Sequence, residues 1–166
     1  IRTIFNILGP LTNPAGATMQ VLGVYEKELV EPLINVLNNL GVKSALSVYG
    51  MDGMDEFSVS DKTFVSELKN GRTRIYEVLP EDFGFELASK SDLVGGDAKE
   101  NAQITLDILK GEKGPKRNAV LLNSAAGLYV AGEVDSLEEG VKMAEELIDS
   151  GRALRQLEKF IEFTNS

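Results

Sequence analysis

The apolar positions in the first fifty residues predict a strand, a helix and a second strand. Residues 20–25 (QVLGVY) form a compact apolar run typical of a strand. In residues 27–41 the apolar positions recur at helical spacing until Gly41, a residue typical of a helix end. Residues 44–50 (SALSVYG) predict another strand. With short links between them, these elements predict a parallel, right-handed crossover unit.

The next segment alternates and is interrupted by Asn70-Gly71, a strong hairpin signal. We therefore expect residues 63–68 and 73–79 to pair as antiparallel strands along the edge of the parallel sheet.

Beyond Pro80 the pattern predicts helices. Asp97 can cap one helix, and Ser136 with Glu139 forms a capping box for another. Residues 116–132 are small and apolar on nearly all sides, which predicts a buried helix. The four expected segments are 98–111, 116–132, 136–151 and a terminal amphipathic one at 152–163. Strands followed by helices predict an α/β fold with a mostly parallel sheet, an antiparallel hairpin at its edge and helices covering it.

Composition sets the size of the fold and excludes several functions. A chain of 166 residues, 43% of them hydrophobic, predicts one domain over residues 1–166. A formal net charge of −9 argues against a general nucleic-acid-binding protein. The sequence contains neither Cys nor His, which excludes disulfides, thiolate metal sites and a Ser-His-Asp hydrolase. Without an apolar run of membrane-spanning length or an export signal, we expect a cytoplasmic protein with no membrane partner.

An acidic cluster, GMDGMDEFS, follows the second predicted strand. It brings Asp52, Asp55 and Glu56 to the carboxyl end of that strand, where open α/β sheets have their ligand crevice. Adjacent carboxylates repel one another, and Mg²⁺ prefers oxygen ligands, so the cluster is a candidate cation site. A pair of general acid/base carboxylates and an ordinary acidic turn are the alternatives, and the spacing alone does not decide between them.

Three further stretches have structural interpretations. LGPLTNPAG, residues 8–16, predicts a rigid apolar loop of the kind that lines a pocket. GGDAKENA, residues 95–102, could present helix amides to an anion, but Asp97 already supplies one at the cap. NSAAGLY, residues 123–129, favours close helix packing over catalysis. Arg2, an early cation, is not assigned a role.

Taken in order, RTIFNILGPLTNPAG, GVY, DGMDE, GGDAKENA and NSAAGLYVAG closely resemble the anthranilate phosphoribosyltransferase family. The resemblance covers essentially the whole chain. It implies the carboxyl-terminal part of the larger α/β domain of a nucleoside phosphorylase/phosphoribosyltransferase-like fold. A start at Ile1 instead of Met agrees with this expectation of a partial domain.

The resemblance implies transfer of the phosphoribosyl group from phosphoribosyl pyrophosphate to anthranilate in tryptophan biosynthesis, with release of pyrophosphate and with Mg²⁺ as cofactor. Asp55 and Glu56 match the family's metal ligands, while Asp52 is expected in a supporting or turn role. Gly9 and Pro10 match the stretch that lines the aromatic substrate's channel. Anthranilate brings its own nucleophilic nitrogen, so no catalytic acid or base is assigned.

Some family features are missing from the sequence. The glycine-rich pyrophosphate loop and the anthranilate-recognising arginine would lie upstream of Ile1, so we expect little or no activity from this chain alone. The helical domain that mediates homodimerisation in the family is also absent, and Tyr49 stands where relatives commonly have histidine. A pyrimidine nucleoside phosphorylase, a nucleic-acid-binding paralogue and a folding or interaction module are the alternatives.

Overall fold

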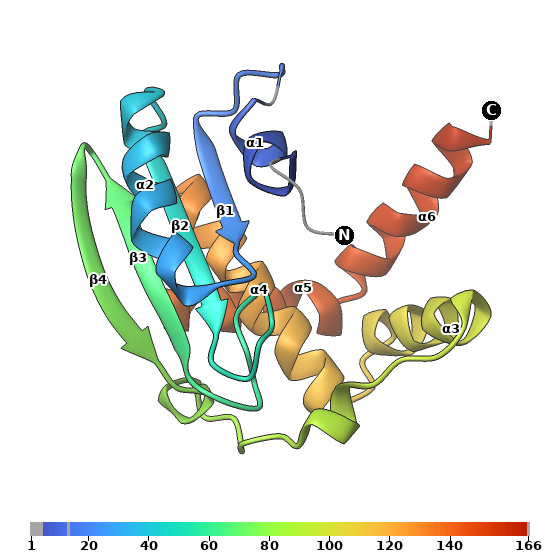
Figure 1. Cartoon of the computed structure of the whole chain (residues 1–166). Coiled ribbons are helices and arrows are strands. Elements are labelled where there is room, and N and C mark those ends of the chain that lie inside the picture. The colour runs from blue at the N-terminus through green and yellow to red at the C-terminus, as the bar shows by residue number, and fades with distance from the viewer. Residues whose placement is uncertain (1–4, 13, 166) are drawn as a thin grey trace.

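A four-stranded mixed sheet forms the centre of the computed structural model, which describes residues 5–12 and 14–165. Its strands lie side by side in chain order (Figure 1): β1 (Met19–Gly23), β2 (Ser44–Gly50), β3 (Thr63–Lys69) and β4 (Arg72–Val78). β1 and β2 are parallel and are connected through the crossover helix α2 (Val30–Asn39), which follows a short 3-10 turn at Lys27–Leu29. The predicted strand–helix–strand unit is therefore confirmed.

The other strand pairings are antiparallel, which corrects the expectation of a mostly parallel sheet. β2 pairs antiparallel with β3, and β3 with β4, so β1–β2 is the parallel pair among the described strands. The cause lies in the connection after β2. A loop without a helix, residues 51–62, links β2 to β3, whereas the crossover to a parallel neighbour usually contains a helix.

The hairpin of β3 and β4 forms at the predicted turn. Both turn residues have positive φ, 52° at Asn70 and 74° at Gly71, as the tight turn between twisted strands requires. The register joins Lys69 to Arg72 and Thr63 to Val78. The hairpin is therefore the antiparallel edge that the sequence predicted.

Helices cover both faces of the sheet. α2 packs on one face, where Ala45 and Leu68 meet its buried side chains. On the other face lie α4 (Pro115–Ala131) and α5 (Leu137–Asp149), which pack against Leu46, Val48 and Val65. Alternate strand residues thus supply two separate apolar cores.

α4 is buried along one side only. Leu122, Ala125 and Ala126 are fully buried, whereas Ser124 and Gly127 are exposed, so the helix is less enclosed than its composition suggested. The small residues do allow a close approach. A Cβ atom added to Gly140 of α5 would lie 2.9 Å from the Cα of Ala125. This contact confirms the packing role predicted for the NSAAGLY segment.

A buried carboxylate ties the hairpin to α4. Glu67 on β3 is 3% exposed. Its Oε2 accepts hydrogen bonds from Arg74 Nε at 2.9 Å and from the Tyr76 hydroxyl at 3.0 Å, and its Oε1 accepts one from the Tyr129 hydroxyl at 2.7 Å. Burial, followed by the neighbouring charge of Glu67, raises the pKa of Tyr76. The network satisfies a charge that would otherwise be costly to bury.

Both predicted N-cap residues are present, but the capping box at Ser136 is only half formed, because the Glu139 carboxylate accepts from Asp135 N instead of Ser136 N. The Asp97 carboxylate accepts a hydrogen bond from Glu100 N at 2.9 Å at the start of α3 (Ala98–Leu109). Ser136 Oγ accepts one from Glu139 N at 3.2 Å at the start of α5. Two further 3-10 turns, Pro80–Phe83 and Lys90–Leu93, lie between the hairpin and α3. None of the helices in the described part of the chain has the length and apolarity to cross a membrane.

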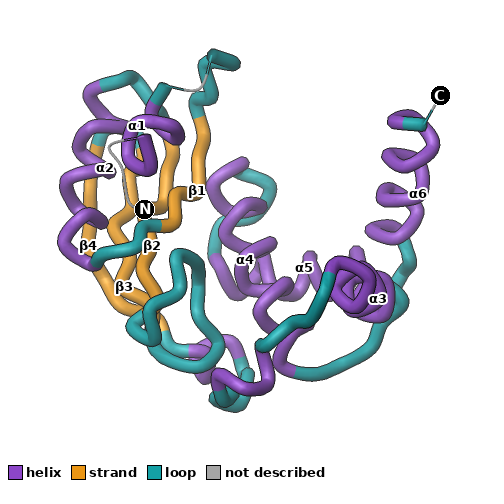
Figure 2. Tube along the Cα trace, turned by 45° about the vertical axis from the view of Figure 1, so that its right-hand side comes forward, coloured by secondary structure: helices purple, strands orange, loops and turns teal. Residues whose placement is uncertain are grey.

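The terminal helix α6 (Arg152–Thr164) projects away from the sheet (Figure 1). Figure 2 shows α3 and α6 on the side of α4 opposite the strands. α6 contains no buried residue, and the side chains of Phe160 and Phe163 are 60% and 79% exposed. The predicted amphipathic helix therefore forms, but most of its apolar face is uncovered. β1 also has one edge with no partner among the described strands.

Candidate functional site

The acidic cluster lies in the loop of residues 51–62 that leaves the carboxyl end of β2. Because β1 and β2 are parallel, their carboxyl ends lie at the same end of the sheet. The loop passes beside the end of β1 (Figure 1). The strand-end position that the sequence predicted for Asp52, Asp55 and Glu56 is confirmed.

Asp52 is bound within its own loop. Its Oδ2 accepts hydrogen bonds from the hydroxyls of Ser58, at 2.8 Å, and Ser60, and its Oδ1 accepts one from Met54 N at 3.3 Å. Burial raises the pKa of the Asp52 carboxyl, but the hydrogen bonds from Ser60, Ser58 and Met54 outweigh it and leave the pKa lowered. This arrangement agrees with the supporting role expected of Asp52.

Asp55 and Glu56 are available to a ligand. The Asp55 side chain is exposed and that of Glu56 is half-buried. Within the described chain, neither carboxylate has a hydrogen-bonding or ion-pairing partner. Burial, followed by repulsion from Asp55 and Asp52, raises the pKa of Glu56. A bound cation would relieve that repulsion.

The donor set fits a cation that is only partly held by protein. Across residues 5–12 and 14–165, no group of three or more His, Cys, Asp or Glu side chains is placed to hold a metal ion. Two free carboxylates suit Mg²⁺, which usually takes one or two protein carboxylates and completes its shell with water and substrate phosphates. Asp55 and Glu56 are thus compatible with a shared site for Mg²⁺ and a phosphorylated substrate.

Contacts from elsewhere in the chain fix the backbone of this loop. A Cβ atom on Gly23, at the end of β1, would lie 1.5 Å from the carbonyl oxygen of Asp55, so only glycine permits this approach. Lys90 Nζ donates to the carbonyl oxygen of Asp52 at 2.6 Å, and Asn123 on α4 bonds the backbone of Phe57. The sequence did not identify these three supporting residues. Two of them begin motifs quoted from the sequence, Gly23 in GVY and Asn123 in NSAAGLYVAG, but neither motif indicated a contact with the acidic loop.

Gly9 and Pro10 do not lie in a loop. They belong to α1 (Phe5–Leu11), which corrects the expectation of an irregular segment over residues 8–11, whereas residues 12 and 14–16 are irregular, as predicted. Pro10 has no N–H to donate to the carbonyl one turn earlier, so this short helix forms with one hydrogen bond fewer. Its carbonyl accepts a hydrogen bond from Gln20 Nε2 at 3.1 Å, and its side chain lines a cavity of about 220 Å³.

Pro10 and the acidic pair meet different ends of β1. Pro10 is bound to Gln20 near the start of the strand, whereas Asp55 lies against Gly23 at its end. Tyr49 packs beside the α2 core. Arg2 lies outside the described residues.

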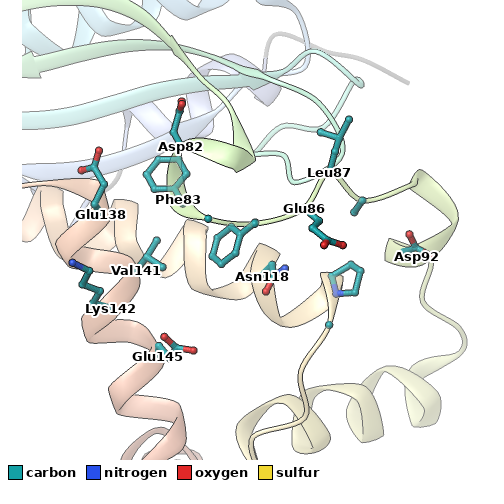
Figure 3. A pocket seen from close by; sticks show the side chains of 15 residues that line it. Asp82, Phe83, Glu86, Leu87, Asp92, Asn118, Glu138, Val141, Lys142 and Glu145 are labelled. Atoms are coloured by element: carbon teal, nitrogen blue, oxygen red, sulfur yellow. The ribbon is translucent and has the colours of Figure 1, made fainter.

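A larger cavity, of about 860 Å³, lies away from these residues (Figure 3). Residues 82–88 and the starts of α4 and α5 line it, including Phe83 and Val141. Several of its carboxylates already have partners: Asp82 accepts from Leu79 N, and Glu145 pairs with Arg117 at 3.4 Å. None of the sequence-predicted site residues lines this cavity.

Residues 1–154 match the family described as "Glycosyl transferase family, a/b domain". The chain belongs to this family. Its α/β sheet and strand-end acidic loop lie within the matched residues.

Similar proteins from this glycosyl transferase family include an anthranilate phosphoribosyltransferase of Methanobrevibacter smithii, 74% identical over all 166 residues. The crystal structure of anthranilate phosphoribosyltransferase from Thermus thermophilus is 42% identical, with a TM-score of 0.91 over the whole chain. The Saccharomyces cerevisiae enzyme in complex with PRPP and Mg is 35% identical, with a TM-score of 0.83 over 98% of the chain. The chain spans 50%, 49% and 47% of these three proteins, about half of each.

Proposed function

We propose that the longer protein containing this chain transfers a phosphoribosyl group from phosphoribosyl pyrophosphate to the amino group of anthranilate, in tryptophan biosynthesis. Its family is one of glycosyl transferases, and similar proteins over the whole of this chain are anthranilate phosphoribosyltransferases. The observation that carries the proposal is the pair of free carboxylates, Asp55 and Glu56, on a fixed loop at the carboxyl end of β2.

In this proposal Asp55 and Glu56 hold Mg²⁺ together with the diphosphate of the substrate. The cation, when bound, supplies positive charge that stabilises the pyrophosphate leaving group. The loop contributes by keeping two carboxylates at a fixed position, so that catalysis depends on positioning and electrostatics. The anthranilate amine is its own nucleophile, and the proposal assigns no acid or base to this chain.

Gly9 and Pro10 remain a prediction as part of the channel for the aromatic substrate. Both residues would shape that channel, since neither Gly9 nor Pro10 has a side chain that can transfer a proton. Cytoplasmic location and homodimerisation of the full-length protein also remain predictions.

The remaining half of the protein is needed for the proposed activity. The chain spans about half of its relatives, and the upstream pyrophosphate loop and arginine implied by the family resemblance are not in its sequence. The open edge of β1 and the uncovered face of α6 are the surfaces on which the remaining half would pack. We therefore expect the chain alone to show little or no transfer, and product formation at a rate close to that of a full-length relative would contradict this.

The test is to change each carboxylate in the full-length protein. Asp55→Asn and Glu56→Gln should each lower kcat by roughly tenfold to a hundredfold and raise the Mg²⁺ concentration needed for half-maximal rate, because each removes charge from the metal site. Asp61→Asn, in the same loop, is the matched control. Anthranilate and a pyrimidine nucleoside with phosphate should be assayed in parallel. Unchanged kinetics for both variants would refute the metal site, and activity only on the nucleoside would favour the phosphorylase alternative.

A further inference from the structure

One amide side chain on α4 binds both backbone polar groups of a loop residue beside the acidic pair. Asn123 Oδ1 accepts a hydrogen bond from Phe57 N at 3.0 Å, and Asn123 Nδ2 donates to Phe57 O at 2.9 Å. Phe57 directly follows Glu56. The side chain therefore acts on Phe57 as a neighbouring strand would, although α4 is a helix.

A third hydrogen bond fixes the orientation of the amide. Asn123 Nδ2 also donates to the carbonyl oxygen of Ala119, one turn earlier in α4, at 3.0 Å. The amide thus uses its acceptor and its two donor hydrogens at once. Among ordinary side chains, only an amide offers an acceptor and a double donor in one plane, so Asp, Ser or Leu could not make the same set of bonds.

Phe57 is also held by its side chain. Its ring is 1% exposed and packs in the core shared with Leu46, Leu122 and Ala126. On the other side of the acidic pair, the carbonyl of Asp55 lies against Gly23 of β1. The backbone that carries Asp55 and Glu56 is consequently held between a strand on one side and a helix on the other.

We propose that Asn123 is a positioning residue for the acidic pair, and that its clamp on Phe57 keeps Asp55 and Glu56 oriented to bind Mg²⁺ together with the substrate's diphosphate. This inference rests on the proposed function. Asn123 itself touches neither metal nor substrate in this role. It acts through the backbone, in the way that groups beyond the ligands of a metal site orient those ligands.

The alternative is a purely structural clamp that satisfies the backbone of Phe57 without affecting the carboxylates. Both versions lower stability when the amide is removed, because a buried N–H and C=O lose their partners. The two versions differ in metal binding, so the experiment must measure metal affinity and loop order separately.

The experiment compares Asn123→Ala and the milder Asn123→Ser in the full-length protein with Ser124→Ala, an exposed position on the same helix. Loop order is measured as hydrogen–deuterium exchange of the Phe57 and Ser58 amides, which are both hydrogen-bonded. Metal affinity is measured as Mn²⁺ binding, in place of Mg²⁺, by EPR in the presence of pyrophosphate. The melting temperature of each variant shows that it is folded under the conditions used.

We expect the Phe57 amide to exchange about fivefold to tenfold faster in both Asn123 variants, since the hydrogen bond from Phe57 N, of about 1 kcal/mol, is lost. Mn²⁺ affinity should fall on the order of tenfold, while Ser124→Ala changes neither quantity. Unchanged exchange, or faster exchange with unchanged Mn²⁺ affinity, overturns the inference about Asn123 but leaves the proposed metal site standing. Wild-type protein that binds no Mn²⁺ refutes the proposed metal site, and the inference with it.

Discussion

The loop of residues 51–62 is held by many contacts although it is irregular, whereas the helix α6 is regular but has few contacts with the rest of the molecule. The loop has no regular structure, yet β1, α4 and the turn at Lys90–Leu93 all contact its backbone, and Phe57 within it is buried. α6 is a regular helix, yet none of its residues is buried. Regular backbone hydrogen bonding is therefore a poor guide to which part of this molecule is fixed.

The difference follows from what each segment contacts. Loops need outside partners for their backbone groups, and this loop finds them in its own side chains and in distant elements. A helix satisfies its own backbone and can project without them, provided that its apolar face is covered by something else. We expect substitutions in the loop to affect the stability of the chain strongly and those in α6 to affect it weakly.

The largest effect is expected from removing the aromatic anchor of the loop. Phe57→Ala should lower the free energy of unfolding by roughly 3–5 kcal/mol, because a fully buried ring leaves a cavity in the core. Phe160→Ala in α6 is the matched control at a residue that is 60% exposed. Urea unfolding of both variants measures the difference, and equal losses would break the contrast.

A smaller loss is expected at the point where the loop meets β1. In Gly23→Ala the new methyl group would overlap the carbonyl of Asp55, so the loop must move, at a cost of about 1–3 kcal/mol. Gly127→Ala is the control, since a methyl group at this exposed position of α4 meets nothing within 4 Å, and Ala favours a helix over Gly by about 0.5–1 kcal/mol. Destabilisation by Gly127→Ala or none by Gly23→Ala, read from melting temperatures, would contradict the close approach.

A pH-dependent effect is expected at Asp52. Its folded-state pKa is lowered, so its stabilisation is present above the unfolded-state pKa, about 3.9, and is lost as pH falls through the folded-state value. The stability difference between wild type and Asp52→Asn should therefore be largest near neutral pH and shrink below about pH 4. Thermal melts from neutral to acidic pH measure this, with Asp61→Asn as control. A difference that grows on acidification would show the opposite sign of shift.

The smallest effect on this chain is expected in α6. A double substitution, Phe160→Ser with Ile161→Ser, should change the free energy of unfolding of the isolated chain by less than about 0.5 kcal/mol, because both side chains are largely exposed. In the full-length protein the same change should cost more if the remaining half covers this face. Equal effects in the two proteins would show that α6 is exposed in both.

Local signals predicted most of the elements. Strand patterns, the Asn70-Gly71 turn and the caps at Asp97 and Ser136 depend on neighbouring residues, and each was confirmed. The direction of β3 relative to β2 depends on the path of the loop between them, which local patterns do not record. The prediction of a mostly parallel sheet was therefore wrong. Residues 8–11 were expected in a loop because the segment 8–16 contains two prolines and two glycines, yet they belong to α1.

The site was predictable only in part, because its contacts join residues that are distant in the sequence. The acidic run and the strand before it placed Asp55 and Glu56 correctly at the sheet edge, but their role as metal ligands stays a prediction. Sequence spacing could not separate Asp52, which is bound by Ser58 and Ser60, from the free pair. The contact between Asn123 and Phe57 joins residues 66 positions apart, which no local pattern records.

That separation has a consequence for synthesis of the protein. The strands on both sides of the acidic loop, β2 and β3, are complete by Lys69, but the amide that holds Phe57 is added only at residue 123. At a translation rate of about 5–20 residues per second, the ribosome adds the residues from Lys69 to Asn123 in roughly 3–11 seconds. For that interval a nascent chain carries the acidic pair with its strands but without its helix contact. We therefore expect the acidic loop to reach its final geometry after the sheet edge around it.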